Sequence, residues 1–212
     1  MRKKIIFSLK NKVVIITGGS SGIGRAISIL FAQQGAEVHI FDLQSPLSDE
    51  TIAEVKNYDD NSKFHPVDIT NEALVLEEIN SLNRIDILIN NAGIAQIGNV
   101  ENTSSEDFQK IFDVNVKGAF NCIKAVIPNM VSHNSGIILN MASVASSVGI
   151  PDRFGYSMTK GAIKSMTQSI AKDYISKGIR CNCISPARVH TPFVDGFIAK
   201  NYPNNQVEMF KK

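Results

Sequence analysis

The sequence lacks long apolar runs, long runs of one charge and the cysteine patterns of metal sites. A helix that spans a bilayer needs about 20 predominantly apolar residues, and no window of the 212 residues approaches that length. Lys and Arg number 22 against 20 Asp and Glu, so the formal net charge of +2 provides no basic surface for nucleic acid. We therefore expect neither a membrane nor a nucleic acid as partner.

The cysteines further limit the classes of protein to which the chain can belong. Cys122, Cys181 and Cys183 form no CxxC pair and no Cys/His cluster with metal-ligand spacing, so we expect no metal site. An odd number of cysteines is typical of a reducing compartment. The N-terminal apolar run at residues 5–7 is interrupted by polar residues too early for a signal peptide. We expect a cytoplasmic protein whose three cysteines are buried.

Short runs rich in Val and Ile alternate with longer amphipathic stretches. Near-continuous apolarity over a few residues is what a strand covered on both faces requires. The predicted strands are residues 13–16, 38–41, 64–67, 85–89, 137–140 and 179–184. The predicted helical stretches include residues 26–31 and 74–79, a long stretch over 104–131 with an irregularity near Asn115, and a second long stretch over 154–176.

This alternation predicts the fold class. Parallel strands need crossover connections of about a dozen residues or more, and right-handed crossovers place helices on both faces of one sheet. The chain has 43% hydrophobic residues and no repeat or low-complexity linker, so residues 1–212 can form a single domain. We expect an α/β protein with a doubly wound, parallel, Rossmann-like sheet in a three-layer α/β/α arrangement.

A glycine-rich segment, TGGSSGIG at residues 17–24, lies between the first predicted strand and a helix. Its glycines permit a tight turn and a close approach of the backbone to a pyrophosphate, and the helix N-terminus offers free N–H groups to phosphates. The same segment can also be a turn without a ligand, but the strand before it and the helix after it favour a dinucleotide site. The candidate cofactor-binding residues are Gly18, Ser20, Ser21, Gly22, Ile23 and Gly24.

Asp42 ends the second predicted strand. A carboxylate at this place can accept hydrogen bonds from both ribose hydroxyls of the adenosine half, and it repels a 2′-phosphate. Residues 41 and 43–45 carry no charge. An Asp at a strand end can also simply cap a turn. The sequence favours NAD over NADP.

A second set of polar residues suggests acid/base chemistry. Ser143 follows the fifth predicted strand, and Tyr156 and Lys160 lie four residues apart on one helical face. A tyrosine phenol has a pKa of about 10, so it needs a nearby positive charge, here Lys160, to act as a base at neutral pH. Ser143 would hydrogen-bond the substrate oxygen. Alone, Tyr-x-x-x-Lys is a common pair on helix surfaces.

Together with Asn90-Asn91-Ala92-Gly93 after the fourth strand and with Asn115, these motifs stand in the order and spacing of the short-chain dehydrogenase/reductase family, which the chain resembles over nearly its whole length. The resemblance implies an NAD-dependent enzyme that moves a hydride between NAD and an alcohol or carbonyl substrate. It implies that Tyr156 is the acid/base and also contacts the cofactor, and that Lys160 lowers the pKa of Tyr156 and holds the nicotinamide ribose. Ser143 would anchor the substrate oxygen, and Asn115 would hold a water that links Lys160 to solvent.

The resemblance implies further cofactor contacts near the adenine, along the cleft and at the carboxamide. They are, in that order, Asp68 and Ile69, Asn91 and Gly93, and Val189 and Thr191. It also implies a homotetramer or homodimer formed through the two long helices.

The substrate is less defined. Arg153 and Arg188 can bind a carboxylate, which suits a hydroxy acid or sugar acid, and His190 is a third candidate contact, although all three can equally be surface residues. A neutral sugar also stays open. The alternative enzyme is a 3-oxoacyl thioester reductase, but such reductases favour NADPH, and Asp42 argues against that cofactor.

The chain stops at Lys212, whereas members of the family continue through another helix and a seventh strand. We therefore expect a sheet without its last strand, with residues 179–184 as an uncovered edge. This departure keeps open a protein of another class, one that binds NAD without turnover.

Overall fold

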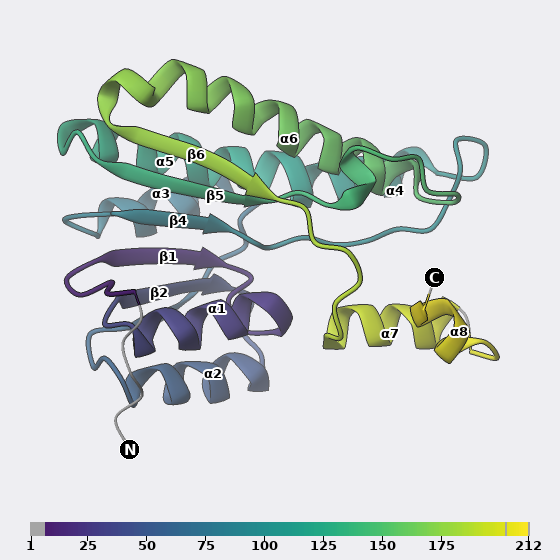
Figure 1. Ribbon diagram of the computed structural model, residues 1–212, viewed down its shortest axis with the longest axis horizontal. Helices are drawn as coiled ribbons and strands as arrows, with labels where there is room; N and C mark the ends of the chain where they lie inside the picture. The colour runs from purple at the N-terminus through teal and green to yellow at the C-terminus, as the bar shows by residue number, and fades with distance from the viewer. Residues whose placement is uncertain (1–6, 202, 212) are drawn as a thin grey trace.

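Figure 1 shows the computed structural model, which describes residues 7–201 and 203–211; residues 5, 6 and 212, named above, lie outside them. The described residues form one six-stranded parallel sheet in the order β3-β2-β1-β4-β5-β6. The strands are β1 (Val13–Thr17), β2 (Glu37–Asp42), β3 (Lys63–Pro66), β4 (Ile87–Asn90), β5 (Gly136–Met141) and β6 (Ile179–Ile184). The predicted doubly wound α/β fold is confirmed, and β6 lies at an edge of the sheet.

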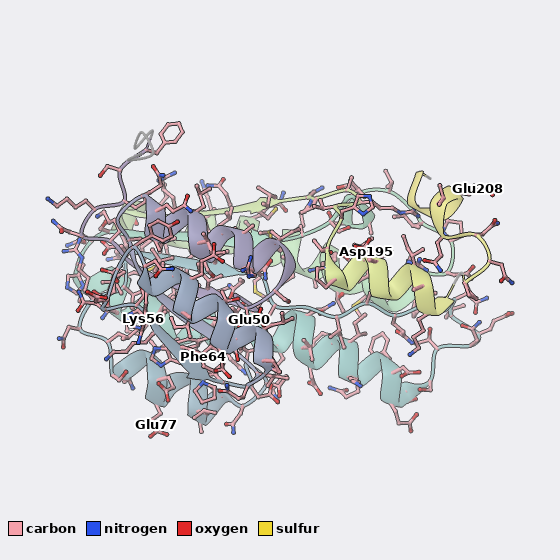
Figure 2. The ribbon with its side chains drawn as sticks, turned by 90° about the horizontal axis from the view of Figure 1, so that it is seen from below. Glu50, Lys56, Phe64, Glu77, Asp195 and Glu208 are labelled. Carbon is pink, nitrogen blue, oxygen red and sulfur yellow. The ribbon has the colours of Figure 1, made fainter. Side chains whose placement is uncertain are left out.

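Eight α-helices accompany these strands in the described part of the chain. They are α1 (Gly22–Gln33), α2 (Pro46–Lys56), α3 (Glu72–Asn80), α4 (Ser105–Phe112), α5 (Gly118–Ser132), α6 (Phe154–Tyr174), α7 (Pro192–Asn201) and α8 (Gln206–Lys211). Helices α1 and α2 cover one face of the sheet, and α3, α5 and α6 pack against the other (Figure 1). Helix α7, which carries Asp195 in Figure 2, lies beyond the carboxyl ends of the strands.

Two differences from the predicted elements have clear physical reasons. The fourth strand begins at Ile87 rather than at residue 85, because the backbone N–H of Ile85 donates to the Asn129 side chain at 3.0 Å instead of to a neighbouring strand. Helix α2 was not predicted. It begins with a capping box between Ser45 and Ser48 and a proline at its first turn, and it has little apolar periodicity to reveal it.

The core consists of two layers, one on each side of the sheet. Alternate residues of β1 serve both layers: Val14 faces α1 and α2, and Ile15 faces α3, α5 and α6. Cys122 and Cys181 are buried in the second layer, as predicted, but Cys183 is only half-buried because it lies near the end of the edge strand. No helix in the described part of the chain is long and apolar enough to cross a membrane.

The irregularity predicted near Asn115 is a π-helical turn, Asp113–Lys117, which joins α4 to α5. Single π-turns inside α-helices often occur at functional sites. This turn directs the side chain of Asn115 into the protein, where only 2% of the residue is exposed. The turn therefore supplies a polar contact between the helical layer and the carboxyl ends of the strands.

Two histidines form an unusual polar contact within the layer of α3 and α5. His39 Nδ1 lies 2.9 Å from His65 Nε2, and the outer ring nitrogens contact Glu37 Oε1 at 3.0 Å and Glu78 Oε2 at 2.7 Å. Burial lowers the pKa of His39; Glu37 opposes this effect, and His65 reinforces it. The folded protein therefore favours the neutral form of His39.

This pKa shift predicts a pH-dependent stability. Unfolding releases His39 to its ordinary pKa of about 6.5, so the unfolded chain takes up the proton that the folded chain resists. We expect the free energy of unfolding, measured by urea denaturation, to fall as the pH is lowered through and below about 6.5. His39→Gln should reduce this slope, whereas His133→Gln, at an exposed site, should not. An unchanged slope in His39→Gln would contradict the assignment.

Candidate active site

The carboxyl ends of the parallel strands form one cavity of about 1100 Å³, where ligands bind in open α/β sheets. Its lining brings together most of the predicted site residues, although they are spread over almost the whole chain. Those that line it are Gly18, Ser21, Gly22, Ile23, Asp42, Asp68, Ile69, Asn91, Gly93, Ser143, Tyr156, Lys160, Val189 and Thr191. The other six, Ser20, Gly24, Asn115, Arg153, Arg188 and His190, are outside the lining.

The glycine-rich loop follows β1 and has the conformation that its glycines allow. Gly18 and Gly22 have φ angles of 61° and 52°, in the left-handed region that disfavours other residues. Gly24 packs so closely that a Cβ atom there would collide with the carbonyl oxygen of Gly18 and the Asn91 amide. The loop therefore presents bare backbone at the N-terminus of α1.

Asp42 is held at the edge of the cavity by backbone groups. Its Oδ2 accepts from the N–H of Ser20 at 3.0 Å, and its Oδ1 accepts from the N–H of Leu43 at 2.8 Å. No arginine is present among the described residues that line the cavity. The carboxylate is thus fixed to the glycine-rich loop, with lone pairs left for further donors.

Three of the four residues predicted to be catalytic lie in α6 and in the segment that follows β5. Lys160 is 6% exposed, and its Nζ donates to the carbonyl oxygen of Met141 at 2.7 Å and lies 5.7 Å from the centre of the Tyr156 ring. Ser143 is 7% exposed, follows β5, and accepts from the N–H of Ala145 at 3.2 Å. The phenol and the amine of α6 and the hydroxyl that follows β5 thus lie in one cluster at the cavity.

Burial dominates the charge state of this cluster. It raises the pKa of Tyr156, and the Ser143 hydroxyl and the Arg153 guanidinium lower that pKa by less. Burial lowers the pKa of Lys160 to about 8. In the protein by itself, the phenol is therefore protonated at neutral pH, and Arg153 is the cation that lowers its pKa. The expected effect of Lys160 on Tyr156 stays a prediction for the enzyme with its cofactor.

Asn115 does not line the cavity but supports two parts of it. Its Oδ1 accepts from the N–H of Ile94 at 2.8 Å, and its Nδ2 donates to the Ile94 carbonyl at 2.9 Å and to Thr159 Oγ1 at 3.1 Å. Both amide hydrogens are used by protein groups, so a water bound by Asn115 must donate to one of its oxygens.

Sequence reasoning did not find three residues that contact the predicted site: Ile94, Thr159 and Met141. Ile94 and Met141 act through backbone groups, and a threonine inside a helix carries no distinctive sequence pattern.

The three candidate substrate residues occupy different surroundings. Arg153 precedes α6, donates to the carbonyl of Asp152 at 2.8 Å, and is close enough to Tyr156 to lower the pKa of that residue. Arg188 is exposed, and His190 Nδ1 lies 3.1 Å from Asp195 Oδ1 in an exposed pair. Of the three, Arg153 is the one whose charge lowers the pKa of Tyr156.

The sequence matches the short chain dehydrogenase family over residues 12–201, so the chain belongs to that family. It is 39% identical to an uncharacterized oxidoreductase of Thermotoga maritima over 97% of this chain and 82% of that protein. It is 38% identical to a 2-(R)-hydroxypropyl-CoM dehydrogenase of Xanthobacter autotrophicus, with 86% and 76% covered. The structure of a levodione reductase matches with a TM-score of 0.89 and 31% identity, covering 95% of this chain and 81% of that one. The chain is therefore an oxidoreductase of the family that acts on CH–OH groups.

The close packing of the glycine-rich loop can be tested by adding one methyl group. Gly24→Ala should weaken NADH binding at least about tenfold, a free-energy loss of about 1.4 kcal/mol or more, because the Cβ meets backbone that cannot move without opening the loop. NADH fluorescence titration measures the effect.

Gly161→Ala is the matched control, since Gly161 lies inside α6 with open space around its Cβ position. This control should bind NADH normally and gain about 0.5–1 kcal/mol of stability from its better helix propensity. Equal NADH affinity in Gly24→Ala and the wild type would show that the loop does not approach the cofactor.

Proposed function

We propose that this chain transfers a hydride between NAD and a secondary alcohol or its carbonyl. The observation that carries the proposal is that Ser143, Tyr156 and Lys160 line the same cavity as the glycine-rich loop and Asp42. An acid/base cluster and a dinucleotide-type loop in one cavity are the two parts that such a reaction needs.

The residues of the cavity fit a nicotinamide dinucleotide. Gly18 and Gly22, which line the cavity, give the loop its left-handed turns and leave backbone without side chains facing the cavity. Gly24 behind them packs too closely for any side chain. Asp42 would hold the adenosine ribose, and Lys160 would hold the nicotinamide ribose. The cofactor supplies the hydride acceptor in oxidation and the hydride donor in reduction.

In alcohol oxidation, Tyr156 as phenolate takes the hydroxyl proton while the C–H electron pair leaves as hydride, so a carbonyl forms. Ser143 donates a hydrogen bond to the reacting oxygen and holds it near Tyr156. Burial raises the pKa of Tyr156, so the positive charges of Lys160 and of oxidised nicotinamide are needed to favour phenolate. In reduction, the Tyr156 phenol returns the proton.

NAD is the proposed cofactor because Asp42 would face a 2′-phosphate with a carboxylate. The same residue disfavours the alternative of an NADPH-dependent 3-oxoacyl thioester reductase.

Arg153 beside Tyr156 favours substrates that carry an acidic group, such as hydroxy acids and sugar acids, while Arg188 and His190 are weaker candidates. The similarity to a 2-(R)-hydroxypropyl-CoM dehydrogenase agrees with an alcohol substrate.

We also propose a homodimer or homotetramer. Helices α5 and α6 are the longest of the fold and lie on the same side of the sheet, so their outer faces are the proposed interface. Light scattering of the purified chain measures the assembly.

Replacement of the proposed acid/base provides the main test of mechanism. Tyr156→Phe should lower kcat about 100-fold or more, because it removes the only group proposed to move the substrate proton, and NADH affinity should change little. Tyr174→Phe, at the far end of the same helix, is the control and should retain full turnover. Wild-type kcat in Tyr156→Phe at saturating substrate would exclude this mechanism.

Cofactor choice is tested separately. NADH should bind at least about tenfold more tightly than NADPH, a difference of about 1.4 kcal/mol. Asp42→Asn should reduce this preference by removing the repulsion of the 2′-phosphate, and Asp173→Asn, at the exposed end of α6, should leave it unchanged. Equal affinity of the wild type for both cofactors would contradict the role of Asp42.

A further inference from the structure

We propose that Thr159 is a positioning residue that fixes the Tyr156–Lys160 turn of α6 against the π-helical turn through its hydroxyl group. This inference rests on the proposed function, because it assigns Thr159 a part in the same acid/base chemistry. Thr159 itself does not line the cavity and would act only through its neighbours.

The Thr159 hydroxyl makes two hydrogen bonds inside the protein. The residue is fully buried, and its Oγ1 donates to the carbonyl oxygen of Tyr156 at 2.8 Å and accepts from Asn115 Nδ2 at 3.1 Å. A hydroxyl has one hydrogen to donate, so its donor capacity is spent on Tyr156. The side chain therefore joins the backbone of the proposed catalytic residue to a different element.

Asn115 extends this connection to the loop after β4. Its remaining amide hydrogen and its Oδ1 are paired with the carbonyl and the N–H of Ile94. Gly93, the preceding residue, lines the cavity, and a Cβ atom there would lie 3.1 Å from Asn115 Oδ1 and 3.6 Å from Lys160 Nζ. The loop, the π-helical turn and α6 thus meet around the two polar side chains of Asn115 and Thr159.

Removal of the Thr159 hydroxyl should affect the rate of the reaction more than the stability of the fold. Asn115 would keep its two bonds to Ile94 but would have a buried N–H without a partner, so the turn of α6 must shift to relieve it. Tyr156 and Lys160 lie on that turn, and their contacts are with Ser143 and with the Met141 carbonyl. Small displacements of reacting groups have large effects on rate.

The same helix contains a matched threonine away from the cavity. Thr167 is also buried, its Oγ1 donates to the Ile163 carbonyl at 2.7 Å, and it accepts from Asn140 Nδ2 at 2.9 Å. It repeats the arrangement of a threonine that joins its own helix to an asparagine of another element. Thr167→Val is therefore the control for the general cost of losing a buried hydroxyl.

The first readout needs neither substrate nor cofactor. The chain has four tyrosines, so protein labelled with ¹³Cζ-tyrosine gives four NMR signals, and Tyr156→Phe assigns the one of interest. Burial raises the pKa of Tyr156 and the Ser143 hydroxyl lowers it, so a shift of the turn away from Ser143 should raise the pKa further. We expect Thr159→Val to move this titration to higher pH, and Thr159→Ser and Thr167→Val to match the wild type.

The second readout is the pH profile of kcat for alcohol oxidation. Thr159→Val should lower kcat roughly 10- to 100-fold and shift the acidic limb to higher pH, because the phenolate is the active form. Thr159→Ser, which keeps the hydroxyl, should restore both the wild-type kcat and the wild-type position of the acidic limb. Thr167→Val should lower the melting temperature without moving the limb. If Thr159→Val does not fold, Thr159→Ala takes its place.

The proposal is overturned if Thr159→Val, or the Ala variant, leaves the Tyr156 titration unchanged, if Thr167→Val shifts it equally, or if Thr159→Ser does not restore it. The proposed function fails separately, when the wild-type chain binds NADH but oxidises no alcohol. In that case, a Tyr156 titration moved only by loss of the Thr159 hydroxyl would still support the positioning role.

Discussion

The active-site cavity depends on the contact between the glycine-rich loop after β1 and Asn91 after β4. The Asn91 side chain donates to the carbonyl oxygens of Thr17 at 3.2 Å and Gly18 at 2.9 Å, and its backbone N–H donates to Thr17 Oγ1 at 3.0 Å. Two neighbouring strands of a parallel sheet are thereby fixed to each other at their carboxyl ends. Gly24, in the first turn of α1, can lie directly against this junction only because it has no side chain.

The polar side chains at the cavity explain why the site must be rigid. Lys160 is buried and Tyr156 is half-buried, and this burial disfavours the charged form of each side chain. An amine and a phenol in such surroundings function together only when their separation and their hydrogen-bond partners are fixed. The Met141 carbonyl fixes the amine, and Asn115 with Thr159 ties the helical turn to the loop that carries Gly93. The proposed chemistry therefore depends on the position of α6 relative to the cavity.

The fold could be predicted from the sequence because buried parallel strands such as β1 and β4 have continuous apolar runs. Helix α2 could not, because only Ser48, Thr51 and Val55 of that helix are buried and no apolar stripe marks it. Family motifs identified many of the residues that line the cavity, including Asp42, Tyr156 and Lys160. They did not reveal Thr159 or Ile94, whose roles depend on a π-helical turn and on backbone atoms. They also did not separate Arg153, which lowers the pKa of Tyr156, from the exposed Arg188.

The most direct test of the account is transfer of isotope from the cofactor to a substrate. The purified chain would be incubated with NADH deuterated at C4 of nicotinamide and with a panel of ketones, keto acids and oxidised sugars, and the products analysed by mass spectrometry. The account predicts deuterium at the new carbinol carbon of at least one product, and a rate of transfer at least about 100-fold lower with Tyr156→Phe. Tight NADH binding without deuterium in any product would contradict it and would indicate a protein that binds the nucleotide without turnover.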